Sequence, residues 1–281
     1  MYSQVGHLTG VDTCSEFMRT LILLALVFLL SVTPCSALEE QGRVLFVGNS
    51  LTYVGNLPAV FAALAEANGK PIASDMIVRG GATLSGRVID GSVARAISDE
   101  KYTAVVVQER GGDLMCLFGP DSCVQSRRAI KSLVERANET GAKIVLLGTY
   151  QFQPDAALRL VEHEAAAAQE AGIPYIEVSL KLWQLGGAGP EFTWLANDGM
   201  HPGKDLLLLD ASLVYQALFG SLPRPKPLTV TAPIYGSTSG LTESLRQSDA
   251  PPPLPDTPRE VLYTDETIEK ILSVINRAGS N

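Results

Sequence analysis

The chain has 281 residues, of which 46% are apolar and 19% are charged, and its formal net charge is -8 at pH 7. This composition is ordinary for a globular protein with a sizeable core, and the length allows one large domain or two small ones. The negative charge and the lack of a basic cluster argue against a nucleic-acid-binding protein. The acidity by itself predicts only that the protein is soluble.

The N-terminal segment, residues 1–37, has the order of a secretory signal peptide. An apolar run from Leu21 to Val32 follows Arg19 and precedes small residues that end at Ala37, after which we expect cleavage. The run is shorter than the ~20 residues that span a bilayer, so we expect no stable membrane anchor after cleavage. Met18 is an alternative start, because residues 1–17 contain no Lys or Arg. We therefore predict a secreted or periplasmic protein.

Four cysteines are present, and only Cys116 and Cys123 lie beyond the expected cleavage site. An exported compartment permits a disulfide between these two, and the alternative is two free thiols in a loop. A lipid anchor on Cys35 is disfavoured, because Pro34 directly precedes that cysteine. No second cysteine pair or nearby histidine completes a ligand set, so we predict no metal site.

The stretch from Arg43 to Val47 is apolar after its first residue, which is typical of a buried parallel strand. Gly48 and Asn49 break the run and leave Ser50 at the strand's exit, where open α/β sheets carry their chemistry. Apolar residues at helical spacing follow, so the pattern predicts a strand, a tight turn and a helix. The alternative is that Asn49 and Ser50 only cap this helix, since both residue types are preferred there.

Strands and helices are predicted to alternate along the next part of the chain. Further strands are predicted at residues 71–78, 102–107, 143–147 and 175–178, with helices at 84–97, 124–141, 155–171, 180–185 and 206–219. This alternation favours a parallel sheet covered by helices on both faces. The predicted fold class is therefore α/β, with five parallel strands in a domain that spans residues 38–220.

Residues 221–281 have a different character, because they contain many prolines, including a run at residues 251–255. Proline fits neither a helix interior nor a central strand, so we predict an extended and poorly packed C-terminal extension. A final amphipathic helix is predicted around Ile268 and Ile275. We expect it to dock on the domain rather than to contact a partner, since a lone helix this short is marginal in water.

His201 is the strongest candidate for a general base. It lies with Asp198 in the loop Asn197-Asp198-Gly199-Met200-His201-Pro202, just before the last predicted helix of the domain. An aspartate at this spacing can bond one imidazole nitrogen through the Gly199 turn and leave the other free to accept the proton of a serine. A loop that only caps the helix is the alternative. His163, by contrast, lies between two glutamates on a helix face that we expect to be exposed.

The combination of Gly-Asn-Ser near the start of the domain with Asp-Gly-x-His-Pro before its last helix resembles the SGNH (GDSL-type) hydrolase family. The resemblance implies a flavodoxin-like three-layer α/β/α sandwich with a five-stranded parallel sheet. It implies Ser50 as nucleophile, Asp198 and His201 as its partners, and the N–H groups of Ser50 and Gly81 in an oxyanion hole.

The third conserved block of the SGNH family differs in this chain. The family has Gly-x-Asn-Asp after the third strand, whereas this chain has Gln108-Glu109-Arg110-Gly111-Gly112-Asp113. We assign the asparagine's role as oxyanion donor to Gln108, whose side-chain amide can present an N–H from the end of the strand. Asp113 is the alternative by position, although an ionised carboxylate cannot donate a hydrogen bond.

The resemblance implies a serine esterase. An esterase that is exported, acidic and soluble fits the hydrolysis of acetyl or short-acyl esters, carbohydrate esters among them. Glu109, Arg110 and Tyr150 lie at predicted strand ends and are candidate substrate-binding residues, because polar groups there suit a saccharide. An apolar lip for an acyl group is the competing interpretation of this edge, with Leu114, Met115, Leu117 and Phe118 as its residues. The alternatives for function are an O-acyltransferase with the same triad and a non-catalytic carbohydrate-binding module. No nucleotide-binding motif occurs, and no cofactor is implied.

Overall fold

The computed structural model describes residues 42–185, 192–241 and 245–277, and the structural statements below concern these residues. The signal peptide predicted over residues 1–37 lies outside them. None of the helices described here is both long and apolar enough to cross a membrane.

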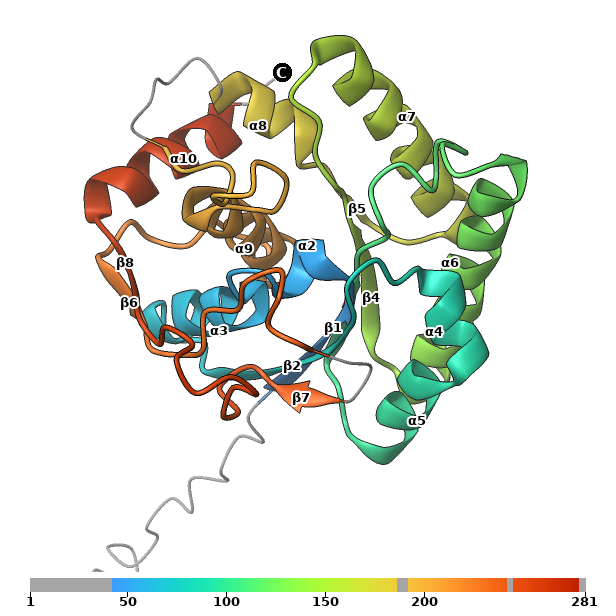
Figure 1. Ribbon diagram of the computed structural model, residues 1–281, viewed down its shortest axis with the longest axis horizontal. Helices are drawn as coiled ribbons and strands as arrows, with labels where there is room; N and C mark the ends of the chain where they lie inside the picture. Colours follow the sequence, from blue (N-terminus) through green and yellow to red (C-terminus); the bar gives the residue numbers. More distant parts are fainter. Residues whose placement is uncertain (1–41, 186–191, 242–244, 278–281) are drawn as a thin grey trace, which may run out of the picture. The chain divides into compact units, whose positions relative to one another are not determined.

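A six-stranded sheet runs through the middle of the structure, with the strand order β5-β4-β3-β1-β2-β7 (Figure 1). Its strands are β1 (Gly42–Gly48), β2 (Ile72–Val78), β3 (Ala104–Val107), β4 (Lys143–Leu147), β5 (Tyr175–Ile176) and β7 (Arg246–Gln247). The first five are parallel to their neighbours, whereas β7 pairs antiparallel with β2. The α/β class and the five parallel strands are confirmed. The prediction of a five-stranded sheet is corrected, because β7 adds a sixth, antiparallel strand.

Helices cover both faces of the sheet (Figure 1). They are α2 (Ser50–Tyr53), α3 (Leu57–Ala67), α4 (Leu84–Asp90), α5 (Ser92–Asp99), α6 (Pro120–Thr140), α7 (Pro154–Ala171), α8 (Ser179–Leu185), α9 (Lys204–Phe219) and α10 (Asp265–Arg277). One buried core joins α3, α8, α9 and α10 to the sheet, and a second core joins α4, α5, α6 and α7 to the opposite face. The predicted three-layer arrangement is therefore confirmed.

Strand β1 contributes to both cores because successive side chains point to opposite faces. Val44 and Phe46 belong to the first core and Leu45 and Val47 to the second, and all four are 0% exposed. Each such burial contributes on the order of 1.5–3 kcal/mol. The flanking strands keep a close register, with Gly48 opposite Val78 on β2 and Val47 opposite Val107 on β3. The segments that follow β1, β2 and β3 therefore leave the sheet at one edge.

Two predicted helices differ from their expected bounds. The helix predicted over residues 84–97 is broken at Gly91, whose φ of 69° ends α4 and lets α5 start in a new direction. Helix α6 begins at Pro120, earlier than the predicted residue 124, because proline is compatible with the first turn. Cys123 therefore lies in the first turn of α6 rather than in a loop.

The C-terminal segment packs against the sheet and against the turn after α2, so the prediction of a poorly packed extension is wrong. The fully buried Asn56 donates hydrogen bonds to the carbonyl oxygens of Pro233 and Ser248, both at 2.8 Å. The Gly55 N–H donates to the carbonyl oxygen of Tyr235 at 2.8 Å. These bonds satisfy an extended backbone that proline prevents from forming a helix.

The remaining C-terminal elements join the core that α3, α8 and α9 form on one face of the sheet. Strands β6 (Leu228–Val230) and β8 (Val261–Tyr263) pair antiparallel. Helix α10 then buries Ile268 and Ile271 completely in the core shared with α9. The predicted docking of the terminal helix on the domain is confirmed.

Candidate active site

Ser50 is the first residue of α2 and follows directly on β1. Asn49 is the N-cap of α2, and its side-chain oxygen accepts a hydrogen bond from the Leu51 N–H at 3.0 Å. Because Asn49 provides the cap, Ser50 is left half-buried in the lining of a cleft of about 550 Å³. The turn therefore both caps a helix and presents a serine.

Asp198 and His201 form a compact turn at the same cleft. Oδ1 of Asp198 accepts hydrogen bonds from the backbone N–H groups of Met200 and His201, both at 3.0 Å. Its Oδ2 lies 2.7 Å from Nδ1 of His201. The backbone and side-chain hydrogen bonds from His201, followed by the one from Met200, hold the pKa of Asp198 well below its usual range. The carboxylate stays ionised and favours the imidazole tautomer with the proton on Nδ1.

His201 therefore has Nε2 as its remaining proton acceptor. Within residues 42–185, 192–241 and 245–277, this nitrogen makes no hydrogen bond to a protein group. Ser50 and His201 both line the cleft, and Asp198 contacts His201 from outside its lining. An ionised carboxylate, an oriented imidazole and a hydroxyl are the groups required to activate a serine nucleophile.

Residues 194–203, here called the His201 loop, are fixed by several hydrogen bonds. The Tyr150 hydroxyl donates to the Met200 carbonyl oxygen at 2.6 Å. The Ala196 N–H donates to the His201 carbonyl oxygen at 2.9 Å, and the Gly203 N–H donates to that of Trp194 at 2.8 Å. Burial raises the pKa of Tyr150, so its hydroxyl stays protonated as a donor. Tyr150 lines the cleft as predicted, but its hydroxyl holds the loop in place.

The cleft is lined by the ends of β1, β2, β3 and β4 together with the His201 loop. Its lining residues are Asn49, Ser50, Leu51, Gly81, Arg110, Gly111, Phe118, Tyr150, Gln151, Phe152, Leu195, Gly199, Met200 and His201. Gly81 is among them as predicted, with a φ of 68° that favours glycine. The N–H groups of Ser50 and Gly81 have no acceptor among the described residues, so both remain candidate oxyanion donors.

Gln108 does not line the cleft, and the role predicted for it is corrected. Its side chain is 2% exposed, and its Oε1 accepts a hydrogen bond from the Thr52 hydroxyl at 2.8 Å. Its Nε2 donates to the Gly148 carbonyl oxygen at 3.2 Å. The amide thus connects α2 to the end of β4, and its burial keeps it out of the cleft lining.

Glu109 is also buried rather than exposed to substrate. Its carboxylate accepts hydrogen bonds from the Leu84 N–H at 3.1 Å and from the Arg110 N–H at 2.9 Å. Burial raises the pKa of Glu109 to about 7, although these hydrogen bonds oppose the shift. Glu109 therefore binds the N-terminus of α4, and the prediction that it contacts substrate is wrong.

Arg110 lines the cleft, but its charge is already paired. Its Nε and Nη2 donate to the two carboxylate oxygens of Asp113 at 2.7 and 2.9 Å. The guanidinium carbon lies 3.8 Å from the centre of the Phe118 ring. Asp113 is 2% exposed and does not line the cleft, so it does not take the predicted alternative role of an oxyanion residue. The pair instead supports the ring of Phe118.

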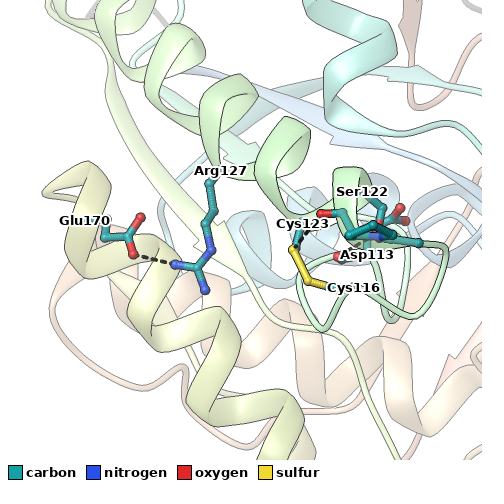
Figure 2. The surroundings of a disulfide bond; sticks show 8 residues. Asp113, Cys116, Ser122, Cys123, Arg127 and Glu170 are labelled. Atoms are coloured by element: carbon teal, nitrogen blue, oxygen red, sulfur yellow. Dashed lines mark hydrogen bonds and ion pairs between the residues drawn. A yellow bond between two sulfur atoms is a disulfide. The ribbon is translucent and has the colours of Figure 1, made fainter.

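The predicted cysteine pair is joined by a disulfide that attaches the loop after β3 to α6 (Figure 2). Cys116 has a φ of 58°, an uncommon conformation for a residue other than glycine. The Ser122 hydroxyl donates to the carbonyl oxygens of Gly119 and Asp113 at 2.9 and 3.3 Å. The loop is therefore tied to α6 at two points.

Several lining residues were not singled out from the sequence, notably Leu51, Gly111, Phe152 and Met200. Phe152 and Met200 are 43% and 66% exposed. Phe152 lies two residues after Tyr150 and Met200 lies directly before His201, so a search for large apolar residues near those predicted positions would have found both. Among the residues described, no cluster of His, Cys, Asp and Glu could hold a metal ion.

A mostly parallel sheet between two helical layers, with a serine after the first strand and an Asp-x-x-His turn before a sheet-covering helix, defines the class of the SGNH hydrolase fold. Comparison with known proteins agrees, because an SGNH hydrolase and esterases are among the structural neighbours of this chain. No protein-family model matches the chain, and no curated protein matches it.

Three solved structures illustrate the likeness. A protein from Slackia heliotrinireducens described as a candidate SGNH hydrolase is 25% identical, with a TM-score of 0.51, and covers 64% of this chain and 100% of its own. A mutant of Axe2, an acetyl-xylooligosaccharide esterase from Geobacillus, is 15% identical, with a TM-score of 0.51 and coverages of 63% and 94%. The esterase EstA from Pseudoalteromonas sp. is 14% identical, with a TM-score of 0.50 and coverages of 64% and 97%. The likeness to Axe2 and EstA is one of fold.

Proposed function

We propose that the protein is an exported serine esterase that hydrolyses acetyl or other short-acyl esters with Ser50, His201 and Asp198. The observation that carries the proposal is the 2.7 Å contact between Asp198 Oδ2 and His201 Nδ1 at the cleft that Ser50 lines. The esterases among the solved structures of the same fold support the reaction class. Export is supported by the signal peptide expected from the sequence.

In the first half of the proposed reaction, Ser50 Oγ attacks the carbonyl carbon of the ester while its proton passes to His201 Nε2. The carbonyl oxygen becomes an oxyanion that accepts hydrogen bonds from the N–H groups of Ser50 and Gly81. The bond to the alcohol oxygen then breaks, and His201 gives its proton to the departing alcohol. The acyl group remains on Ser50 Oγ.

In the second half, water attacks the acyl carbon while His201 accepts a proton from it. Collapse of the second oxyanion releases the carboxylic acid, and His201 returns the proton to Ser50 Oγ. Asp198 stays ionised in both halves because its hydrogen bonds lower its pKa, and it stabilises the imidazolium that forms each time.

The experiment is the hydrolysis of p-nitrophenyl acetate and of an acetylated xylo-oligosaccharide by the purified protein and its Ser50→Ala variant. Ser98→Ala is the matched control, because Ser98 is exposed on α5 and does not line the cleft. We expect Ser50→Ala to lose turnover with an unchanged circular dichroism spectrum, and Ser98→Ala to keep it. Turnover by a folded Ser50→Ala protein at the wild-type rate would reject the triad.

A further inference from the structure

The cleft has one wall whose chemistry the proposed triad does not explain. Phe118 lines it while 56% of its surface is exposed, an unusual position for a phenylalanine. Leu51 also lines the cleft, and its Cδ1 is 3.9 Å from the position that a Cβ on Gly111 would occupy. The cleft lining therefore includes apolar side chains from the residue after Ser50 and from the loop after β3.

The topology shows which part of an ester would reach this wall. The strand order β3-β1-β2 places Ser50, at the end of β1, between Gly81 after β2 and Gly111 after β3. In the proposed reaction, the carbonyl oxygen faces the Gly81 N–H and the leaving oxygen faces His201 in the loop before α9. The third substituent of the carbonyl carbon is the acyl chain, which then points towards Gly111 and Phe118.

The electrostatics of the wall favour an uncharged acyl group. The Arg110 guanidinium carbon lies 3.8 Å from the centre of the Phe118 ring, and the buried Asp113 accepts two hydrogen bonds from the same guanidinium. A second carboxylate would have to displace Asp113 from two short hydrogen bonds. An apolar chain requires no such exchange and removes exposed apolar surface from water.

The wall is held in place rather than free to adapt. Phe118 lies between Cys116 and Cys123, and this disulfide closes the loop onto α6 (Figure 2). The Arg110 guanidinium packs against the Phe118 ring, and the Asp113 carbonyl oxygen accepts a hydrogen bond from the Ser122 hydroxyl. A fixed aromatic surface loses little conformational entropy when a chain packs on it.

We propose that Phe118 and Leu51 form an apolar acyl subsite that selects butyryl or hexanoyl esters over acetyl esters, with the Cys116–Cys123 loop as its support. The proposal rests on the proposed esterase function and names its substrate class. Each methylene that reaches the wall contributes roughly a fourfold gain in kcat/KM, so butyrate, which has two more methylenes than acetate, is preferred by about fifteenfold.

The experiment measures kcat/KM for p-nitrophenyl acetate, butyrate and hexanoate with the wild type, Phe118→Ala and Leu117→Ala. Leu117 is the matched control, since it is 63% exposed on the same loop but does not line the cleft. We expect the butyrate-to-acetate ratio to fall to about twofold in Phe118→Ala and to be retained in Leu117→Ala. The ratio between 1-naphthyl and p-nitrophenyl acetates, which varies only the alcohol, stays constant in Phe118→Ala.

A second variant tests the support of the wall. In the Cys116→Ser/Cys123→Ser protein, the loop is released from α6 and the butyrate-to-acetate ratio falls in the same direction as in Phe118→Ala. An unchanged ratio in Phe118→Ala, or an equal fall in Leu117→Ala, would overturn the subsite while leaving the esterase in place. A wild-type protein that hydrolyses none of these esters above Ser50→Ala would overturn the proposed function and the subsite together.

Discussion

Replacing Asp198 by asparagine keeps the shape of the side chain but removes its charge and replaces one carboxylate oxygen by an NH₂ group. Oδ1 accepts two backbone hydrogen bonds, from Met200 and His201, whereas Oδ2 faces His201 Nδ1. The two backbone donors require an oxygen, so the amide oxygen of Asp198→Asn takes the place of Oδ1 and the amide NH₂ faces His201. The ring must then accept at Nδ1 and carry its proton on Nε2, where it cannot accept the proton of Ser50.

The magnitude follows from the same contacts. Rotating the amide to restore the correct tautomer would lose two hydrogen bonds, at about 1 kcal/mol each, and would place the NH₂ against two N–H donors. The rotated form is therefore a minor species, held below a few per cent. Together with the lost charge, the wrong tautomer costs on the order of 10⁴ in kcat, which corresponds to about 5.5 kcal/mol of activation free energy.

The assay is kcat/KM for p-nitrophenyl butyrate, measured with the thermal unfolding midpoint of each protein. Asn197→Ala is the matched control, because Asn197 is exposed in the same loop and does not line the cleft with Ser50. We expect Asp198→Asn to unfold near the wild-type temperature and to lose activity by thousands-fold. A folded Asp198→Asn protein within tenfold of the wild-type kcat/KM would refute the tautomer argument.

Two further predictions concern buried polar residues near the cleft. Gln108→Met keeps the volume of the side chain but leaves the Thr52 hydroxyl and the Gly148 carbonyl oxygen unpaired. We therefore expect the free energy of unfolding, measured with urea, to fall by about 2 kcal/mol while kcat/KM stays within threefold of wild type. A hundredfold loss of kcat at unchanged stability would restore the oxyanion role. Glu164 accepts hydrogen bonds from Thr149 and Tyr175, and burial raises its pKa from 4.5 to about 7. The unfolded chain ionises at the lower pKa, so stability falls by up to about 3 kcal/mol as pH rises from 4.5 to 7 and is level above it. Urea midpoints at pH 5 and 7.5 should differ less in Glu164→Gln than in the wild type, and equal differences would contradict the assignment.

The parts of the site that could be predicted from sequence are those fixed by local chemistry. Ser50 follows an apolar strand and a turn, and Asp198 lies three positions before His201. Both the serine and the Asp-His pair can therefore be recognised in short stretches of sequence. The parallel sheet follows in the same way from alternating apolar strands and amphipathic helices.

Gln108 and Glu109 could not be assigned correctly, because their surroundings come from distant residues. Gln108 bonds Thr52 and Gly148, and Glu109 binds the start of α4 at Leu84. The residue type at the end of a strand determines which hydrogen bonds its side chain can form. The direction of that side chain depends on the twist of the sheet and on the neighbouring loops. The packing of the C-terminal segment was missed for the same reason, since proline content describes only local backbone preference.

The contacts of Asn56 and Gly55 with residues 233–248 also determine the order in which the protein can fold. The turn after α2 receives its backbone partners from Pro233, Tyr235 and Ser248, and β2 receives its outer neighbour from Arg246 and Gln247. These partners lie far downstream in the sequence, and contacts between such distant residues form slowly because a long loop must close first. The segment that supports the candidate nucleophile is therefore completed only after residues 233–248 have been made.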